Sequence, residues 1–428
     1  MRRLFPVALL FLLASCSQNT GGAFSQGATA SPTQAARQAQ LDLHALSAVR
    51  ERAASAMLAH IPAGILDRAW GGGATAALSG PYSDAAPEAD AAGLQALKSL
   101  AEAPAAGISV APGAQPAAAA ATSDAFQQLD GPRGGAYLLL ADAAHPSSPS
   151  GPYPLDPTPT ACSTPPAGPE CLRRQVSDGL LAAWYASDTK MFFKVGETST
   201  AYRPVDAIAV GCALVVAGFQ LHDENKIAAG AMIVSQELRT DIDPHFGLLY
   251  GLSTATSHGG HTATDYHTHL ADQAGAAEAL LEAFDASREQ QYMADAKKLL
   301  QPLMDESVAL RSTGGGYIDG FDLQATGPAE NTPVDVLATV LTLQAAHHYD
   351  RDDGGHFAQL EEAAAATLLM ALDADRRAGG DPAAGLPARL TGATTTARSG
   401  LTTAIAVTVL GDLLRDAQVG AASPSPSL

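Results

Sequence analysis

Carboxylates and an imidazole stand close together in the segment Asp241-Ile242-Asp243-Pro244-His245, which follows a predicted helix and precedes a glycine-aromatic turn. An acid and a base far enough apart to admit a water molecule would suit hydrolysis of a glycosidic bond. Asp319 and Asp322, in a later glycine-rich loop, are the candidate partners of Asp243. The alternative is structural: an Asp-Pro turn that ends a helix and leaves its carboxylates in solvent.

A second polar segment holds four of the twelve histidines of the chain in a single short stretch. His258, His261, His267 and His269 could surround one zinc ion tetrahedrally, although their spacing matches no specific zinc signature. The alternative is a polar loop that holds these histidines by chance. The sequence calls for no cofactor and leaves the question of a metal open.

Acidic residues also recur near the predicted start of one helix in each pair. Asp206, Asp272 and Asp335 follow one another at a nearly constant spacing, and Ser399 continues the series at the same interval. Such carboxylates could hold sugar hydroxyls at the mouth of a funnel. The competing interpretation is helix capping, because Thr332-Pro333-Val334-Asp335 has capping-box spacing with the acid at the third helical position. Ser399 favours capping, since a hydroxyl cannot act as a carboxylate.

Aromatic side chains beside glycine loops are candidate platforms for a sugar ring. The chain has only two tryptophans and ten tyrosines, which weakens a hydrolase interpretation. The candidate ligand-binding residues, aromatic and polar together, are Tyr202, Asp206, His245, Tyr250, Asp272, Tyr317, Phe321 and Asp335.

The elements that must position these residues are helices that come in pairs. Apolar residues at three-and-four spacing predict helices at 205–219 and 226–238, 270–284 and 291–303, and 334–347 and 357–372. The first member of each pair is apolar and small almost throughout, which is typical of an inner layer. The second members carry more charge and suit an outer layer. A helix over 36–60 would pair with the last helix.

This period predicts an all-α fold of five to six helical hairpins joined by short glycine-aromatic loops over residues 36–418. Nine prolines between Pro146 and Pro169 mark an insertion at 144–171, and 419–428 reads as a disordered tail. The hairpin period and the loop Gly314-Gly315-Gly316-Tyr317 resemble the six-hairpin glycosidase-like superfamily, whose fold is an (α/α)6 toroid. An open α-solenoid is the structural alternative.

The N-terminus predicts export. Two arginines precede an apolar run from Leu4 to Leu13 that is too short to span a bilayer, which is typical of a signal peptide over 1–15. The run ends in Leu13-Ala14-Ser15-Cys16, which resembles a bacterial lipobox and implies lipidation of Cys16. Residues 16–35 then form a flexible tether. The absence of Asp at position 17 resembles sorting to the outer membrane, so we expect a lipid-anchored protein of the bacterial cell envelope.

Three cysteines remain after Cys16. Cys162 and Cys171 flank part of the proline-rich insertion, and a disulfide between them would constrain that segment in an exported protein. Cys212 lies in an apolar helix and is expected to be an inert core thiol.

Composition excludes several classes of function. A net charge of −19 argues against a nucleic-acid partner, because phosphate binding requires cationic surface. The chain lacks a nucleophile elbow, a phosphate-binding loop and a dinucleotide fingerprint. Two classes of function survive: a carbohydrate-processing hydrolase, lyase or epimerase with a central funnel, and a non-catalytic lipoprotein that binds a glycan or a partner protein.

Overall fold

The computed structural model describes residues 42–60, 200–255, 261–305, 320–328, 334–377, 385–387, 389–391 and 398–422, together with isolated positions between 92 and 103, between 174 and 181, and at 308, 379, 394 and 395. Its longer helices fall into four pairs: α7 (Pro204–Leu221) and α8 (Glu224–Thr240), α9 (Leu270–Ser287) and α10 (Gln290–Leu300), α11 (Val336–Asp353) and α12 (Ala358–Arg377), and α13 (Gly400–Ala422) with α2 (Leu43–His60).

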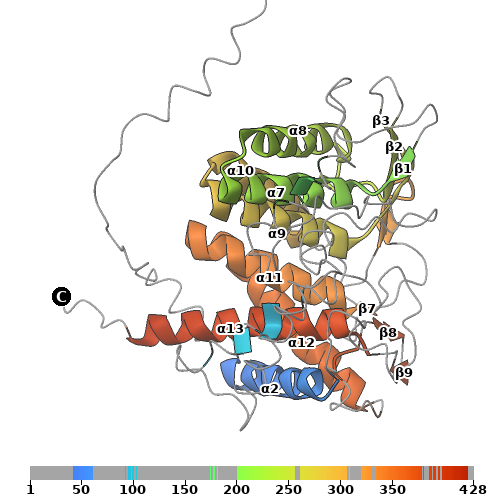
Figure 1. The fold of residues 1–428 in the computed structure, drawn as a ribbon. Helices are drawn as coiled ribbons and strands as arrows, with labels where there is room; N and C mark the ends of the chain where they lie inside the picture. Colours follow the sequence, from blue (N-terminus) through green and yellow to red (C-terminus); the bar gives the residue numbers. More distant parts are fainter. Residues whose placement is uncertain are drawn as a thin grey trace, which may run out of the picture.

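The helices form the two layers that the sequence predicts. The four inner helices α7, α9, α11 and α13 pack successively against one another, while α8, α10, α12 and α2 each cover their own partner (Figure 1). The apolar core lies between the layers and continues through all four pairs. The first described helix, α2, therefore packs against the last one, α13, as the expected pairing of 36–60 with the final helix requires.

Helix ends differ from the predicted ones by a few residues. A short 3-10 helix, η2 (Gln301–Met304), extends α10, and α13 continues to Ala422, beyond the predicted end of the toroid at 418. α7 is long and apolar enough to cross a membrane by composition, but 67% of that stretch is buried, and a core helix passes the same test.

Small antiparallel sheets stand where the sequence analysis expects only short loops. They are β1 (Thr200–Tyr202), β2 (Leu252–Ala255) and β3 (His261–Asp265); β4 (His267–Thr268), β5 (Phe321–Asp322) and β6 (Gly327–Pro328); and β7 (Val334–Asp335), β8 (Arg389–Thr391) and β9 (Thr394–Thr395). β1, β4 and β7 lead directly into α7, α9 and α11. The sheets therefore lie at the end of the molecule where the inner helices begin, on the right in Figure 1.

The acidic repeat combines two different positions of the helix start. Asp206 and Asp272 occupy the third position of α7 and α9, whereas Asp335 is the N-cap of α11 and accepts a hydrogen bond from the Ala338 amide at 3.1 Å. Ser399 accepts the equivalent bond from Thr402, also at 3.1 Å. Capping thus accounts for Asp335 and Ser399, but the expected third helical position for Asp335 is wrong, because Val334 and Asp335 are still in a strand.

The first hairpin is packed unusually closely. A Cβ atom on Gly211 of α7 would lie 2.9 Å from the Gly230 carbonyl oxygen of α8, so the two backbones touch where both residues lack side chains. Cys212 beside this contact is a buried free thiol, as the sequence analysis expects. Burial raises the pKa of that thiol well above its ordinary value, so it stays protonated and unreactive.

Candidate active site in the inner cleft

The predicted residues that the structure describes gather at the end of the molecule that carries the sheets. Asp243 follows α8, and its Oδ1 accepts hydrogen bonds from the His245 and Phe246 amides, both at 2.9 Å. This carboxylate closes the turn after the helix, while the His245 side chain is exposed. The contacts match the turn interpretation of Asp-Pro, and a catalytic role for Asp243 stays a prediction.

Asp322 forms a similar turn from β5. Its Oδ1 accepts from the Gln324 and Ala325 amides at 2.8 and 3.0 Å, and these bonds lower the pKa of its carboxyl. A carboxyl group with a lowered pKa is ionised at neutral pH and has no proton to donate there. His267 lies between Asp265 and Asp322, at 3.0 and 3.6 Å from their carboxylates.

Phe321 and Tyr250, two aromatic candidates within the described residues, pack against protein. Phe321 is 1% exposed, contacts Phe246 edge to face at 5.0 Å and shares a small apolar cluster with Leu248 and Leu323. Tyr250 is half-buried beside Tyr266. Phe321 therefore has no open ring face for a sugar, contrary to the expected platform.

Tyr202 is also buried completely. Its hydroxyl lies within hydrogen-bonding distance of Glu237 Oε1 at 3.2 Å and of Asp241 Oδ2 at 3.1 Å, and Ser253 donates to the same Asp241 carboxylate. Tyr202 thus ties β1 to the end of α8 and does not face a cavity. The expected platform role does not fit this burial.

The two acids at the third helical positions are paired with one arginine. Arg203, the N-cap residue of α7, binds the Asp272 carboxylate and lies 3.9 Å from Asp206. Asp335 lies 3.4 Å from the guanidinium of Arg389 on the adjacent strand. All three carboxylates are buried, so their contacts fix the inner helix starts to their neighbours.

Some predicted residues lie outside the described part of the chain: Cys16, Cys162, Cys171, His258, Tyr317 and Asp319. His261 is described only as part of β3, and His269 is the N-cap residue of α9. The expected single zinc site and the Cys162–Cys171 bridge therefore stay predictions.

A cavity of ligand size lies along the middle and second half of the inner helices, away from the sheets and from the residues that the sequence predicts as a site. It has a volume of about 430 Å³, within the range of roughly 300–1,000 Å³ typical of ligand pockets. We call it the inner cleft. Its lining comes from the middle and second half of α9, α11 and α13 and from two positions of an earlier helix: Gln95, Ser99, Glu278, Glu282, Asp285, Gln344, His347, His348, Arg351, Thr408, Val409, Asp412 and Arg415.

Three inner helices present their polar side chains to this cleft at equivalent turns. On α9, Glu278, Glu282 and Asp285 have the spacing of one helix face, and each has a counterpart one repeat later on α11 and another on α13. The rows are Glu278, Gln344 and Thr408; Glu282, His348 and Asp412; and Asp285, Arg351 and Arg415. These polar positions recur with the period of the hairpins, but they lie inside the helices and not in the loops or helix starts, where the sequence predicts the site.

Hydrogen bonds and ion pairs join the rows across the helices. His348 places Nδ1 3.0 Å from Glu278 Oε1 and Nε2 3.0 Å from Asp285 Oδ2. Gln344 donates to the same Glu278 oxygen at 3.3 Å, and Arg351 donates to Asp285 at 3.2 Å. Burial disfavours the charged imidazole, but the two carboxylates outweigh it and raise the pKa of His348 to about 10. His348 is therefore a cation at neutral pH.

Glu282 differs from its neighbours because no hydrogen bond or ion pair joins it to the described residues. Solvent reaches its side chain, yet protein surrounds the cleft into which it points. Partial desolvation, together with the nearby Glu278 carboxylate, raises the pKa of Glu282 to about 7. A carboxyl group that titrates near neutrality can both donate and accept a proton under physiological conditions.

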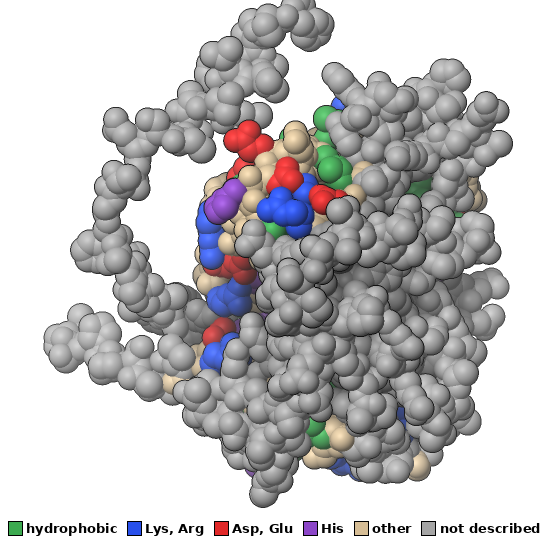
Figure 2. Space-filling view, viewed as in Figure 1, with side chains coloured by type: hydrophobic (Ala, Val, Ile, Leu, Met, Phe, Trp, Pro, Cys, Tyr) green, Lys and Arg blue, Asp and Glu red, His purple; other side chains and the backbone are tan. Residues whose placement is uncertain are grey.

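The far side of the cleft carries a second perturbed acid. Desolvation raises the pKa of Asp412 on α13, although Arg415 at 3.0 Å opposes that shift. His347 lies 3.3 Å from Glu361 and 3.2 Å from Asp416. Its pKa rises to about 9, because these two acids outweigh the effect of burial. Acidic and basic side chains also stand side by side along the left edge of the molecule in Figure 2.

Potential metal ligands meet at the rim of this cleft. Within the described ranges, Asp285, His348 and Asp352 are the group whose ligand atoms lie within 4.8 Å of one another. Arg288 and Arg351 contact both of these aspartates at 3.1 to 3.8 Å. Because cations already neutralise the two carboxylates, the cluster fits an ion-pair network better than a metal site.

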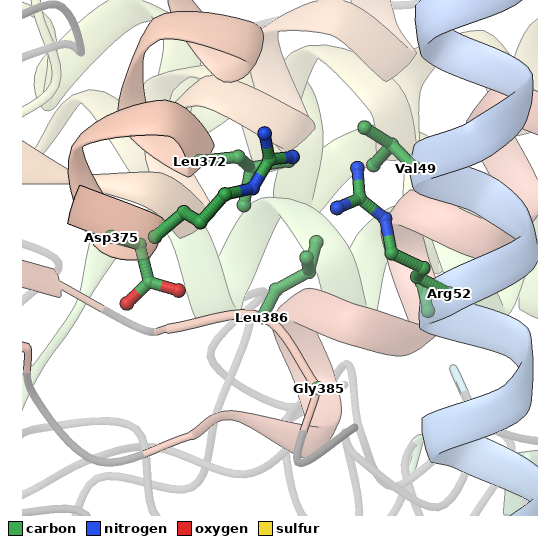
Figure 3. Close-up of a pocket in the computed structure, with 8 residues that line it drawn as sticks. Val49, Arg52, Leu372, Asp375, Gly385 and Leu386 are labelled. Atoms are coloured by element: carbon green, nitrogen blue, oxygen red, sulfur yellow. The ribbon is translucent and has the colours of Figure 1, made fainter. Parts of the chain in front are cut away.

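A smaller cavity lies between α2 and α12. Arg52 and Val49 from α2 face Leu372 and Asp375 from α12 across it (Figure 3). Its volume of about 30 Å³ holds a water molecule and is too small for a sugar.

Solved structures share this architecture. An unsaturated glucuronyl hydrolase specific for heparin matches with a TM-score of 0.56 at 11% identity, over 88% of this chain and 98% of its own. The unsaturated glucuronyl hydrolase from Streptococcus agalactiae matches with a TM-score of 0.56 at 11% identity, over 91% of this chain and 97% of its own. An unsaturated glucuronyl hydrolase from Bacillus sp. GL1, responsible for the degradation of glycosaminoglycan, matches with a TM-score of 0.51 at 12% identity, over 76% of this chain and 85% of its own.

These matches define the class of fold. The chain is an (α/α)6 toroid, which confirms the predicted closed ring rather than the open α-solenoid. No protein-family model matches the chain, and no curated protein sequence matches it significantly. At this level of identity the likeness extends to the fold and not to the reaction.

Proposed function

We propose that this chain is a carbohydrate-active protein that binds its substrate in the inner cleft and uses Glu282 for proton transfer. The observation that carries the proposal is a cleft of ligand size whose polar lining comes from three inner helices and includes a solvent-accessible carboxyl group, Glu282; desolvation and the nearby Glu278 carboxylate raise the pKa of that group. Groups perturbed by both desolvation and a charged neighbour concentrate at functional sites. The fold shared with glucuronyl hydrolases supports a sugar as the ligand.

The surrounding residues supply the other parts that acid–base chemistry on a sugar requires. Glu278, which contacts His348 at 3.0 Å, offers a second carboxyl group on the same helix face. Gln344 and Thr408 offer neutral polar groups to hydroxyls, and Gln95 lies on the same cleft. This set is compatible with hydrolysis, elimination or epimerisation.

Replacement of Glu282 by Gln tests the proposal, because the amide keeps the shape of the side chain but cannot transfer a proton. Purified protein is incubated with a panel of neutral and uronic-acid oligosaccharides, and products are identified by mass spectrometry and anomeric NMR. We expect Glu282→Gln to lower turnover by at least about 100-fold, the usual contribution of a general acid or base.

Asp243→Asn is the matched control, since an Asn side chain can still accept the two turn hydrogen bonds. Full activity of Asp243→Asn beside an inactive Glu282→Gln supports the inner cleft as the site. The reverse result would move the reaction to the sheet end of the ring and support the catalytic role that the sequence predicts for Asp243.

The second candidate function is non-catalytic binding of a glycan or a partner protein. One observation favours it: the described lining of the inner cleft contains no Trp, Tyr or Phe on which a sugar ring could stack. Under this alternative no sugar in the panel is converted, while wild-type protein and Glu282→Gln bind the same glycan with similar affinity in calorimetry.

We also propose that the mature chain is attached to the bacterial envelope, in the outer membrane, through lipid on Cys16. The charged start, short apolar run and lipobox-like Leu13–Cys16 segment support this assignment. No nucleic-acid partner is part of the proposal.

Fractionation of cells expressing Cys16→Ala tests the anchor. We expect the wild-type chain in the membrane fraction and the variant as an uncleaved or soluble precursor, because a thiol is needed to accept the lipid. A Ser17→Ala variant, which keeps the thiol, should behave like the wild type. Unchanged membrane attachment of Cys16→Ala would contradict the proposed lipidation.

A further inference from the structure

We infer that His348 is a positioning residue for the acids of the inner cleft: its imidazolium bridges Glu278 and Asp285, and this leaves Glu282 as the carboxyl group of the cleft that keeps a proton. The importance of this arrangement for turnover rests on the proposed function of Glu282. The electrostatic part of the inference can be tested without a substrate.

Both ring nitrogens of His348 face carboxylates, Glu278 from one turn of α9 and Asp285 from the turn that ends it, each at 3.0 Å. A neutral imidazole has one donor and one acceptor, so only the imidazolium can donate to both acids. Its side chain is 11% exposed, which leaves little water to screen the charge. The geometry therefore favours the imidazolium form of His348, in line with its raised pKa.

Glu278 and Glu282 lie one helical turn apart on α9, so their side chains are neighbours on one helix face. Two such acids in a cleft repel one another when both are ionised, so the second proton leaves at higher pH than the first. Glu278 accepts from both His348 and Gln344, whereas Glu282 has no hydrogen bond or ion pair within the described structure. Glu282 is therefore the acid of this face that holds its proton most readily.

The other charged groups that face the cleft are already paired. Arg351 of α11 pairs with Asp285 and contacts Asp352, and Arg415 of α13 pairs with Asp412. His347, next to His348, points to Glu361 of α12 and Asp416 of α13. Among these cations, His348 is the one in contact with Glu278.

Loss of the His348 imidazolium should change the titration midpoint of the neighbouring acids in a known direction. Without it, the state in which Glu278, Glu282 and Asp285 are all ionised loses a central positive charge and becomes less stable. The last of the three protons is therefore released at higher pH, and the change belongs to the coupled group of acids as a whole.

The test is a carboxyl NMR titration of the full protein labelled with ¹³C at glutamate side-chain carboxyls, with Glu282→Gln used to identify the signal that titrates near neutrality. We expect His348→Gln to raise that midpoint by roughly one pH unit or more. His348→Lys, which retains a cation, should keep it close to the wild-type value. His347→Gln is the matched control, because it removes an adjacent buried imidazolium that does not touch Glu278 and should leave the midpoint in place.

A midpoint that does not move in folded His348→Gln, or that moves equally in His347→Gln, would overturn the inference. If His348→Gln does not fold, the ring nitrogens of His348 are followed in wild-type protein by ¹⁵N NMR. Both should remain protonated at pH 8, and a neutral ring at that pH would overturn the inference as well.

The titration separates this inference from the proposed function. A shifted midpoint without any sugar turnover would support the positioning of the proton and count against the enzyme. Turnover that requires Glu282 but keeps its pH profile in His348→Gln would support the enzyme and count against the positioning role.

Discussion

Carboxyl groups inside this ring are accommodated in two ways: some are paired with a cation, and one keeps its proton. In the inner cleft, cations from α11 compensate acids from α9. Around Glu237, the described partners are the Tyr202 hydroxyl and another acid, Asp241, and none of the described residues brings a cation to the Glu237 carboxyl group. Desolvation and the Asp241 carboxylate raise the pKa of Glu237 well above its usual value, and this fully buried side chain keeps its proton.

The protonated state of Glu237 predicts how stability depends on pH. The folded chain holds a proton that the unfolded chain releases above the ordinary carboxyl pKa of 4.5, so this group makes stability fall as pH rises above that value, by up to about 1.4 kcal/mol per unit. Glu237→Gln removes the ionisable group and can still donate to Asp241. We expect it to match the wild type near pH 4.5 and to exceed its stability at pH 7 and above.

Thermal unfolding followed by circular dichroism between pH 4.5 and 8 measures this effect. Glu224→Gln, on the same helix but exposed, is the control and should give curves parallel to those of the wild type. A Glu237→Gln protein that loses stability with pH as steeply as the wild type would show that Glu237 is ionised in the fold.

At the scale of the element, helices of this chain are determined by apolar spacing and by local end signals. Asp223 at the start of α8 accepts from the Asn225 and Lys226 amides, and Gly354 ends α11 with a φ of 75°. Such signals are local and can be recognised in a sequence. Contact between α7 and α8 depends instead on two glycines, Gly211 and Gly230, that lie on different helices and have no shared local signature.

Gly230→Ala tests this contact. The added Cβ would lie 2.9 Å from Val215 Cγ2 and against the Gly211 carbonyl, so the helices must separate. We expect a loss of about 1–3 kcal/mol in unfolding free energy, the usual cost of overpacking a core.

Gly275→Ala in α9 is its control, because nothing lies within 4 Å of the new methyl group. Alanine is the better helix former, so this variant should gain about 0.5–1 kcal/mol. Urea unfolding of both variants measures their unfolding free energies. Equal changes in the two variants would show that the close contact does not cause the loss of stability in Gly230→Ala.

At the scale of the whole molecule, the ring depends on a contact between its first and last described helices. Arg50 of α2 is 2% exposed, and its guanidinium donates to the Val407 carbonyl of α13 at 3.2 Å and to Ser99 at 3.4 Å. Leu46 and Val49 from the same helix are buried in the main core. α2 therefore covers α13 in the way that each other outer helix covers its partner.

Removal of residues 1–60 should abolish cooperative unfolding, because it exposes the apolar face of α13 and leaves its partners without Arg50. Removal of residues 1–35 alone, the predicted signal peptide and tether, should leave the unfolding transition unchanged. Calorimetry of the two truncated chains measures the difference. A sharp transition at the wild-type temperature after removal of 1–60 would show that the ring is stable without α2.

The sequence by itself determined the hairpins and their order, because apolar periodicity and loop residues act over a few neighbours. It predicted the inner and outer layers, the start of α7 and the pairing of the first helix with the last. It also contained the polar rows of the inner cleft, which recur with the same period as the hairpins. Whether these rows form a site depends on which helix faces point into the ring, and ring closure decides that.

Only the tertiary structure decided which acids stand together and which carry a proton. Asp243 and Asp322 accept hydrogen bonds from amides two and three residues further along the chain, and Asp335 caps its own helix, so these contacts are local. The Arg389 guanidinium beside Asp335 comes from a distant strand, and only the fold brings it there. Glu282 looks like an ordinary helix residue, yet Glu278 on its own helix and His348 on the next inner helix set its environment. A pKa depends on desolvation and on charges a few ångströms away, and both come from chain segments that meet only in the folded ring.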